Sequence, residues 1–368
     1  MTIPWQDAAR RLFDHLERRH WAGDGLVGPD VGIRLNYRVG RFVKSYIPML
    51  PWHDDLYYLQ GQGYWVLANW RLASLFGNPE HGARAVASSD GMLTRQRDDG
   101  AWDYPNPEWK GRVATAEGTW GSIGLLETYN QTGETRFLEG ALRWNRFLEE
   151  EVGYSRAGGG LAVNYCAGRA GLPVPNNTAF VLRFLAELAH STRDKSYCDR
   201  CSSLLDFLRT SQRPSGELPY TLGAGGEAGV EHFQCFQYNA FQCLDLLRYG
   251  ALTGDLTVRP LVEGVLMFLE TGVAADGHVH YGCGETRGRV TYHAAAVAAT
   301  FAEAHAAGVP GHAPTAERVY DYVLSLQRAD GSFPHSFGDY RVLRDVRSYP
   351  RQQAMVLLHL LSARELEV

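Results

Sequence analysis

The sequence predicts one all-α domain over residues 1–368, an (α/α)6 toroid whose six helical hairpins place about twelve helices in an inner and an outer ring. Three observations predict this fold: a motif that recurs through the chain, helices that alternate between two hydrophobic patterns, and connections that alternate between short and long. A chain of this length would ordinarily hold two or three domains, but internal repeats can extend one fold. An open solenoid is the alternative, although a closed ring needs no polar end caps.

The motif consists of Gln-Arg followed by a turn that contains glycine. Clear copies occupy residues 96–102, 212–218 and 327–333, and weaker copies occupy 157–161 and 275–279. Successive motif glycines are 59, 57, 61 and 54 residues apart. These glycines are Gly100, Gly159, Gly216, Gly277 and Gly331. Because each copy follows a stretch with helical apolar spacing and a glycine there stops a helix, the spacing predicts one hairpin per repeat.

Each repeat predicts an outer helix, an irregular segment of roughly 20 residues and an inner helix, followed by a short turn such as Thr132-Gly133-Glu134. The inner helices are apolar on nearly every side, as in residues 293–298, whereas the outer helices carry a charged stripe, as in residues 136–143. A helix that is apolar all round is buried, which places these helices in the inner ring. The predicted pairs are 5–20 with 53–75, 79–96 with 116–131, 135–151 with 176–190, 196–212 with 232–250, 257–271 with 291–306, and 314–328 with 349–362.

Composition excludes several classes of partner. Apolar residues make up 45% and charged residues 21% of the chain, and the formal net charge of −5 offers no basic surface for nucleic acid or an acidic membrane. No run of about 18 apolar residues predicts a membrane span, and the polar opening does not resemble a signal peptide. Six cysteines do not make a disulfide framework in a chain of 368 residues. We therefore expect a cytoplasmic protein.

The long connections all lead into the N-termini of the inner helices, so we expect these six entrances to meet at one end of the ring. Free N–H groups and positive dipole ends at helix N-termini favour ligand binding at such a mouth. The entrances are polar and aromatic for the starts of buried helices. One polar residue in each recurs at steps of 63, 60, 61, 55 and 58 residues. These residues are Asp54, Glu117, Asn177, Tyr238, His293 and Arg351.

The residue types at the mouth indicate acid–base chemistry. Asp54 or Asp55 and Glu117 come from neighbouring inner helices, and paired carboxylates drive their pKa values apart. Tyr238 and His293 are alternative proton carriers. The candidates for substrate binding are His53, Tyr57, Trp120, Asn176, Asn177, His232, Gln237, Tyr292, Tyr349 and Arg351.

These residues also have a purely structural interpretation. His293 could be a core histidine, and the entrance aromatics could simply pack. Since the functional interpretation rests on polar residues at all six entrances together, no single residue decides it. Five residues are of the types that cap helix N-termini, namely Asp54, Asp55, Asn176, Asn177 and Thr291.

We expect no metal ion or other cofactor. Cys198 and Cys201 form a lone Cys-x-x-Cys on a predicted outer helix, where we expect them to pack. Among the side chains near the mouth, only His232 and Cys235 have a familiar zinc-ligand spacing. The side chains that could hold zinc there are His232, Cys235, Cys283 and His293.

The repeated Gln-Arg-x-Asp-Gly-Ser-Phe run on helical hairpins resembles the wider group of α/α toroid enzymes. That group includes terpenoid cyclases, protein prenyltransferase β-subunits, lanthionine cyclases, D-glucuronyl C5-epimerases, polysaccharide lyases and six-hairpin glycosidases. The terpenoid aspartate motifs are absent, because no Asp-x-Asp-Asp occurs and Asp54-Asp55 continues as Leu-Tyr-Tyr. No cysteine precedes a histidine, as the zinc motif of lanthionine cyclases requires. The glucuronyl epimerases and lyases match more loosely, through the glycines at 158–160 and through Tyr, His and Arg at inner-helix starts.

The resemblance implies a fold more firmly than an activity. Our leading hypothesis is a carbohydrate-active enzyme that acts on a glycan or sugar acid. Hydrolysis would use Asp54 or Asp55 with Glu117 as acid and base. In lyase or epimerase chemistry, a side chain at the mouth would remove the proton beside a carboxylate. The base would be Tyr238 or His293, and Arg351 would neutralise the carboxylate.

Two other classes remain as alternatives. An isoprenoid cyclase or transferase would use the aromatic residues, 12% of the chain, to stabilise carbocations. A non-catalytic binding module would use the entrance residues as separate helix caps. A small-molecule or glycan substrate is the expected partner in the leading hypothesis, and no feature indicates an oligomeric state.

Overall fold

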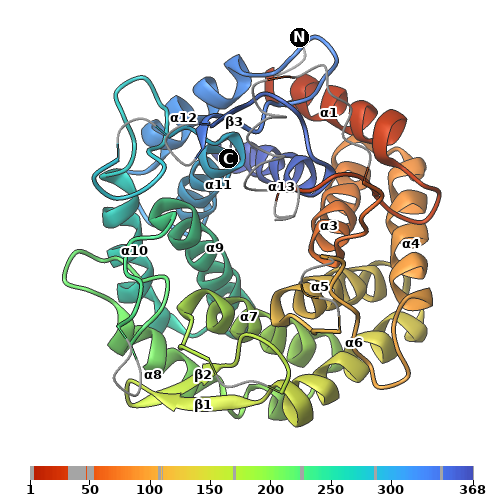
Figure 1. The fold of residues 1–368 in the computed structure, drawn as a ribbon, viewed down its shortest axis with the longest axis vertical. Helices are drawn as coiled ribbons and strands as arrows, with labels where there is room; N and C mark the ends of the chain where they lie inside the picture. The colour runs from red at the N-terminus through yellow and green to blue at the C-terminus, as the bar shows by residue number, and fades with distance from the viewer. Residues whose placement is uncertain are drawn as a thin grey trace.

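The computed structural model describes residues 4–31, 47, 54–106, 109, 111–168, 171–223, 228–285, 288–339 and 343–367. Its α-helices form two concentric rings, as Figure 1 shows, and this confirms the predicted (α/α)6 toroid. The outer ring contains α1 (Pro4–His20), α4 (Pro79–Thr94), α6 (Thr135–Phe147), α8 (Cys201–Ser211), α10 (Arg259–Glu270) and α12 (Ala313–Ser325). The inner ring contains α3 (Leu59–Phe76), α5 (Thr115–Thr132), α7 (Pro175–Thr192), α9 (Cys235–Thr253), α11 (Thr291–Ala306) and α13 (Pro350–Leu361).

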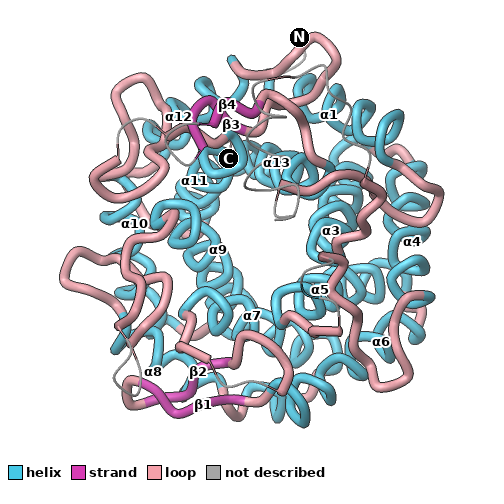
Figure 2. Tube along the Cα trace, viewed as in Figure 1, coloured by secondary structure: helices cyan, strands magenta, loops and turns pink. Residues whose placement is uncertain are grey.

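The connections alternate as the sequence predicted. A short turn joins each inner helix to the next outer helix, and between α3 and α4 it consists of Gly77 and Asn78 alone. The long connections run from each outer helix to the following inner helix, and Figure 2 shows them across the face toward the viewer. All six inner helices therefore begin at the same end of the ring.

The long connections contain elements that the sequence analysis did not predict. Strand β1 (Tyr154–Ala157) pairs antiparallel with β2 (Gly160–Val163), and β3 (Ser336–Asp339) pairs with β4 (Leu343–Asp345). The tight β1–β2 turn forms because both glycines between the strands have positive φ. Short helical segments also extend the helix ends. These are the π-helix η3 (Leu148–Val152) and the 3-10 helices η4 (Lys195–Cys198), η5 (Leu256–Val258) and η6 (Ser362–Leu366).

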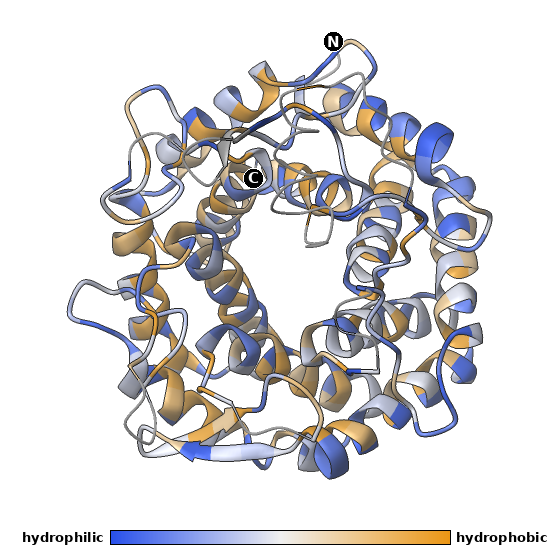
Figure 3. Cartoon of the chain, viewed as in Figure 1, coloured by the Kyte–Doolittle hydropathy of each residue, from blue (hydrophilic) through white to orange (hydrophobic). Residues whose placement is uncertain are grey.

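Hydrophobic packing lies mainly between the two rings. Figure 3 shows hydrophobic residues where the rings face each other and hydrophilic residues along the outer rim. In α11, every residue from Ala294 to Ala299 exposes 1% or less of its surface, whereas α8 buries only one face, which includes Leu204 and Leu208. The two helical patterns of the sequence therefore mark the two rings. In the described part of the chain, no helix has the length and apolar character of a membrane span.

The repeated motif joins neighbouring hairpins through its glutamine and its glycine. Gln212 donates from Nε2 to the carbonyl oxygen of Gly216 at 3.0 Å and to that of Leu261, on the next outer helix, at 2.9 Å. Gly216 has a φ of +87°, and a Cβ there would lie 1.9 Å from the carbonyl oxygen of Gly264. The motif needs glycine because the turn is left-handed and touches the neighbouring helix.

The sixth hairpin makes the same contacts with the first, which closes the ring. Gln327 donates from Nε2 to the carbonyl oxygen of Ala8 at 2.8 Å, and Arg11 donates from Nη2 to the carbonyl oxygen of Arg328 at 2.6 Å. A Cβ on Gly331 would lie 2.1 Å from the carbonyl oxygen of Arg11. The fold is therefore a closed toroid and not the alternative open solenoid.

Buried amides on the inner helices fix the long connections across the mouth. Asn239 on α9 accepts from the backbone N–H of Leu218 at 2.8 Å and donates to its carbonyl oxygen at 3.0 Å. Gln353 on α13 makes the same pair of bonds with Phe333, at 2.9 and 2.8 Å. In each case one amide side chain bonds both the N–H and the carbonyl oxygen of one backbone residue. These two bonds fix the position of the connection relative to the inner helix.

Candidate functional site

A cavity of about 560 Å³ opens at the end of the ring where the inner helices begin. A second pocket of about 170 Å³ continues it between the helix starts, and we call the two together the mouth cavity. Its size is ordinary for a small-molecule site. The residues that line both parts are Tyr104, Trp109, Tyr165, Val174, Tyr220, Tyr238, Tyr292, Arg351 and Gln352.

The structure brings together eight of the predicted site residues. Glu117, Asn177 and His293 are each the third residue of their inner helix, so the repeat places them at the same level. The third residue of α3 is Gly61, where a Cβ would meet the backbone of Arg351 at 3.2 Å. The eight residues that line the mouth cavity are Glu117, Asn176, Asn177, Gln237, Tyr238, Tyr292, His293 and Arg351.

Asp54 and Asp55 do not lie at the start of a helix, so their predicted position is wrong. Helix α3 begins at Leu59 because the preceding chain is extended and pairs with another connection. The N–H of Gly28 donates to Leu56 O at 3.2 Å, and the N–H of Leu56 donates to Gly28 O at 3.1 Å. Asp55 is exposed, and neither aspartate is among the described residues that line the mouth cavity.

Three predicted substrate-binding residues point elsewhere. The ring of Tyr57 lies 4.1 Å below the guanidinium carbon of Arg95, beside the outer helix α4. Trp120 stacks on Tyr64 with a centroid separation of 4.3 Å and lines a cavity of about 410 Å³ toward the other ends of the inner helices. Tyr349 is fully buried. Their predicted roles at the mouth have no support in this geometry.

His232 precedes its helix, because α9 begins at Cys235 and not at residue 232. Gln234, directly before the helix, is in the left-handed conformation with a φ of 45°. His232 faces the carboxylate of Glu217 at 3.0 Å and lines a side pocket of about 240 Å³. His53 lies outside the described residues.

The entrance residues are not helix caps. The N-cap residues of the six inner helices are Tyr58, Ala114, Val174, Gln234, Val290 and Tyr349, and none caps its helix with its side chain. Asn176 and Asn177 lie inside α7, and Asn176 Oδ1 and Asn177 Nδ2 are buried without a hydrogen-bond partner among the residues that the structure describes. The hydroxyl of Thr291 donates to Pro334 O at 2.6 Å. The capping interpretation is therefore wrong for these residues, and the buried amides leave hydrogen-bonding capacity for a ligand.

Arg351 is held by a buried carboxylate that the sequence analysis missed. Its guanidinium donates to both oxygens of Asp30, at 2.7 and 2.8 Å, and to Gln60 Oε1 at 3.2 Å. The same group lies 4.4 Å from the centre of the Tyr58 ring. Asp30 is 1% exposed and belongs to the connection after α1, which has no repeated pattern. Because Asp30 already neutralises Arg351, a substrate carboxylate would meet less than a full positive charge.

Glu117 lies where it can exchange protons near neutral pH. Its Oε2 accepts from the backbone N–H of Gln60 at 2.9 Å, and the side chain is 2% exposed. Burial raises the pKa of Glu117 from 4.5 to about 7, although Arg351 and the Gln60 N–H lower it. Among the described residues that line the mouth cavity, Glu117 is the one carboxylate. The predicted pair of Glu117 with Asp54 or Asp55 is therefore not assembled there.

His293 is a buried histidine without internal partners. Its ring packs against Tyr281 and Tyr292, with centroid separations of 5.7 and 4.5 Å, and it is 1% exposed. Within the described part of the chain, neither ring nitrogen has a hydrogen-bond partner. Burial, reinforced by His335, lowers the pKa of His293 well below 6.5, so the imidazole is neutral near neutral pH. The described residues therefore supply no hydrogen bond that would make His293 a satisfied core histidine.

Aromatic residues from the long connections form the wall of the mouth cavity. Tyr220 lies 4.9 Å from Tyr238, and Trp109 lies 6.1 Å from Tyr165, between ring centroids. The sequence analysis missed the connection residues because it followed the helix starts. Their signal was the presence of large aromatics in irregular segments, where a core role is uncommon. The missed aromatic residues are Tyr104, Trp109, Tyr165, Tyr220 and Tyr281.

The fold is similar to those of several solved structures. A cellobiose 2-epimerase from Bacillus thermoamylovorans matches with a TM-score of 0.76 at 14% identity, over 97% of this chain and 98% of that chain. A family 88 glycosyl hydrolase from Bacteroides vulgatus matches with a TM-score of 0.65 at 10% identity, over 97% and 99%. A polysaccharide lyase matches with a TM-score of 0.66 at 10% identity, over 98% of each chain. No family model and no curated protein matches the sequence.

These likenesses agree with the resemblance to α/α toroid enzymes that the repeated motif indicated. They extend over nearly the whole length of each chain, which confirms the fold. At 10 to 14% identity they do not transfer an activity or a catalytic residue.

Proposed function

We propose that this chain is a carbohydrate-active enzyme that binds a sugar or sugar acid in the mouth cavity and moves a proton at a carbon beside a carbonyl or carboxylate. One observation carries the proposal: the cavity combines Glu117, whose pKa is about 7, with His293, whose ring nitrogens have no hydrogen-bond partner among the described residues. Similar toroids include a cellobiose 2-epimerase and a polysaccharide lyase, and these support the class of substrate and of reaction.

The wall of the mouth cavity suits a sugar ring. Aromatic faces from Trp109, Tyr165 and Tyr220 offer stacking surfaces, and the buried amides of Asn177 and Gln237 have unpaired polar atoms that can bond hydroxyl groups. An isoprenoid diphosphate would favour an apolar cavity with carboxylates to hold its metal ions. The described lining has mixed character and one carboxylate, so it favours the sugar.

Each protein group then has a defined step. Neutral His293 removes the proton from the carbon, and the electron pair moves onto the neighbouring carbonyl or carboxylate oxygen. The converging N-termini of the inner helices and Arg351 stabilise the negative charge that develops on this oxygen. Protonated Glu117 then gives its proton back to the carbon in epimerisation, or to the leaving oxygen in elimination. Tyr238 and Tyr292 line both parts of the cavity.

Hydrolysis has less support from the same geometry. A glycosidase of the usual kind needs two carboxylates on either side of the scissile bond. Of the carboxylates near the mouth, Asp30 is held by Arg351 through two hydrogen bonds, which leaves Glu117. Proton transfer with a histidine and one carboxylate fits the described residues better.

Solvent-exchange NMR in D2O tests the proposal on a panel of reducing disaccharides, monosaccharides and uronates. We expect the proton beside the carbonyl or carboxylate of an active substrate to exchange for deuterium, with or without net conversion. Glu117→Gln and His293→Gln should each lower the exchange rate about 100-fold or more. Glu139→Gln, an exposed carboxylate on the outer helix α6, is the matched control and should exchange at the wild-type rate. Release of a reducing sugar without exchange, or full exchange in both variants, would refute the proposal.

A further inference from the structure

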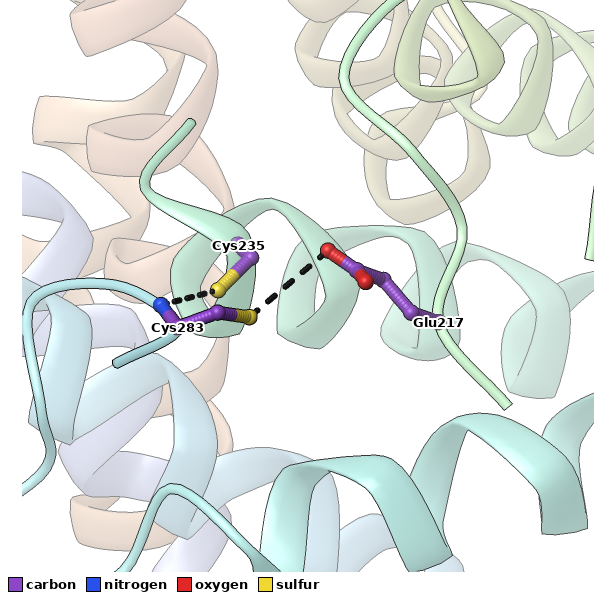
Figure 4. A group of neighbouring side chains, drawn as sticks. All are labelled: Glu217, Cys235 and Cys283. Atoms are coloured by element: carbon purple, nitrogen blue, oxygen red, sulfur yellow. Dashed lines mark hydrogen bonds between the residues drawn. The ribbon is translucent and has the colours of Figure 1, made fainter. Parts of the chain in front are cut away.

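Outside the mouth cavity, two thiols and a carboxylate converge between the connections that precede α9 and α11. The ligand atoms of Glu217, Cys235 and Cys283 all lie within 4.8 Å of one another, and Figure 4 shows their side chains facing a common point. Cys283 Sγ lies 3.8 Å from Glu217 Oε1, and the backbone N–H of Cys283 donates to Cys235 Sγ at 2.9 Å. His232 Nδ1 lies 3.0 Å from the same Glu217 oxygen.

The internal repeat shows that Glu217 departs from its structural equivalents. It follows the motif glycine directly, and the same position holds Ala101 and Ser332 in the other clear copies, both fully buried. Glu217 is also buried, at 1% exposed, although its ion-pair partner His232 is half exposed. A buried carboxylate is unfavourable unless it is paired, and neither Ala101 nor Ser332 brings such a charge to the equivalent positions.

Cys235 departs from the repeat in the same way. It is the first residue of α9, and the first residues of α5 and α11 are Thr115 and Thr291. Each threonine ties its helix to the next connection, with its hydroxyl donating to a backbone carbonyl at 2.7 or 2.6 Å. At α9 a thiol replaces that hydroxyl, and the next connection places a second thiol, Cys283, beside it. Two thiols and a carboxylate are a donor set that zinc binds.

We propose that Glu217, Cys235 and Cys283 bind a zinc ion, with His232 as the fourth ligand. Zinc holds such ligands at ~2.0–2.3 Å, so their atoms in a tetrahedral site lie roughly 3.3–3.8 Å apart. The ligand atoms of Glu217, Cys235 and Cys283, which now lie within 4.8 Å of one another, reach that size if the side chains move by about 1 Å. His232 lies outside this group of three and joins it through Glu217, from which its Nδ1 is 3.0 Å away. Binding releases the protons of the two thiols and places a divalent cation beside Glu217.

The site is structural, because four protein ligands leave no open coordination position. It joins the connection after α8, the start of α9 and the connection before α11. Two residues within these segments, Gln234 and Tyr281, line the mouth cavity and bond to each other at 2.7 Å. Zinc therefore fixes one wall of the cavity and takes no part in the reaction. The inference does not rest on the proposed function, and its test needs no substrate.

A disulfide between Cys235 and Cys283 is the competing explanation for the two thiols. It would use the two thiols alone and would not account for Glu217 and His232 beside them. The full ligand set therefore favours zinc over a disulfide.

Metal analysis of the full-length chain tests the inference. We expect about one zinc per chain after incubation with zinc and removal of the excess, by inductively coupled plasma mass spectrometry. Cys235→Ser and Cys283→Ser should each lower the content about tenfold, and Glu217→Gln and His232→Ala should raise the Kd about tenfold or more. Cys198→Ser, which removes a half-buried thiol elsewhere, is the matched control and should keep its zinc.

Two further measurements use the wild-type chain and so do not depend on folded variants. A cobalt-substituted sample should show thiolate-to-cobalt charge-transfer absorption, and a chelator should lower the melting temperature. The inference is overturned by wild-type protein that holds no zinc, by equal zinc content in Cys235→Ser, or by a Cys235–Cys283 disulfide in freshly isolated protein.

Discussion

Replacing Glu117 with glutamine tests the electrostatics of the mouth cavity without any substrate. Glu117 is 2% exposed, and burial raises its pKa from 4.5 to about 7. Each unit by which the pKa rises corresponds to ~1.4 kcal/mol, so an ionised Glu117 lowers the free energy of unfolding by about 3 kcal/mol. Glutamine has nearly the same shape and still accepts a hydrogen bond from the N–H of Gln60, which lies 2.9 Å from the carboxylate.

The sign of the effect follows from proton binding. Between pH 4.5 and about 7, the folded protein keeps a proton on Glu117 that the unfolded chain has lost. The wild-type free energy of unfolding therefore falls as the pH rises through this window, and the full penalty is present above it. The glutamine variant has no such penalty. Its stability should match that of the wild type below pH 4.5 and exceed it by about 3 kcal/mol at pH 8.

Urea denaturation followed by tryptophan fluorescence, at several values from pH 4.5 to pH 8.5, measures this difference. Because all other groups titrate in both proteins, the difference between their free energies of unfolding at each pH reports on Glu117 alone. Glu139→Gln should stay within about 0.5 kcal/mol of the wild type throughout, because Glu139 is exposed. A Glu117→Gln difference that does not change with pH, or a variant that is less stable at pH 8, would refute the raised pKa.

Two other predictions concern the ion pair and the repeat. Asp30→Asn and Arg351→Met should each lower the free energy of unfolding by about 3 kcal/mol, because each leaves a buried charge unpaired. The double variant removes both charges, so it should lose clearly less than the sum of the two single losses. Additive losses in urea denaturation would contradict a direct pair. Gly216→Ala should lower the free energy of unfolding by about 3 kcal/mol or more, because its Cβ would lie 1.9 Å from a carbonyl oxygen. Gly133 also has a positive φ, of +75°, but open space around it, so Gly133→Ala should lower the free energy of unfolding by about 1 kcal/mol. Equal melting temperatures for the two alanine variants would contradict the close contact.

The sequence predicted the ring because its determinants are local and repeated. The 3.6-residue apolar pattern and the motif glycines recur in successive units, so one correct hairpin predicts the next. The start of α3 was wrong because the pairing of Gly28 with Leu56 joins distant segments and leaves no local signal. The strands β1 to β4 were missed because each is at most four residues long, too short for an alternating pattern to stand out.

The site residues show the same difference between what the repeat predicts and what the connections determine. Glu117 and His293 were found because the repeat places them on the inner helices, whereas Asp30 lies in a connection whose path no pattern predicts. Trp120 was misplaced because it is three residues beyond Glu117, nearly one turn farther from the mouth. Tyr57 was misplaced together with the start of its helix. Position along an inner helix therefore decided which candidates reach the cavity.

The repeat also separates structural positions from functional ones within this single chain. Glutamine begins all three clear copies of the motif, and the contacts of Gln212 and Gln327 show why: each bonds its own turn and the next outer helix. The third residue of the inner helices has the opposite character. Its place in the ring is constant, yet it holds a glutamate in α5, an asparagine in α7 and a histidine in α11. The remaining inner helices hold a glycine, a glutamine and a second glutamine there, namely Gly61, Gln237 and Gln352. Polar side chains of different types at one level of the ring are what the proposed ligand site at the mouth requires.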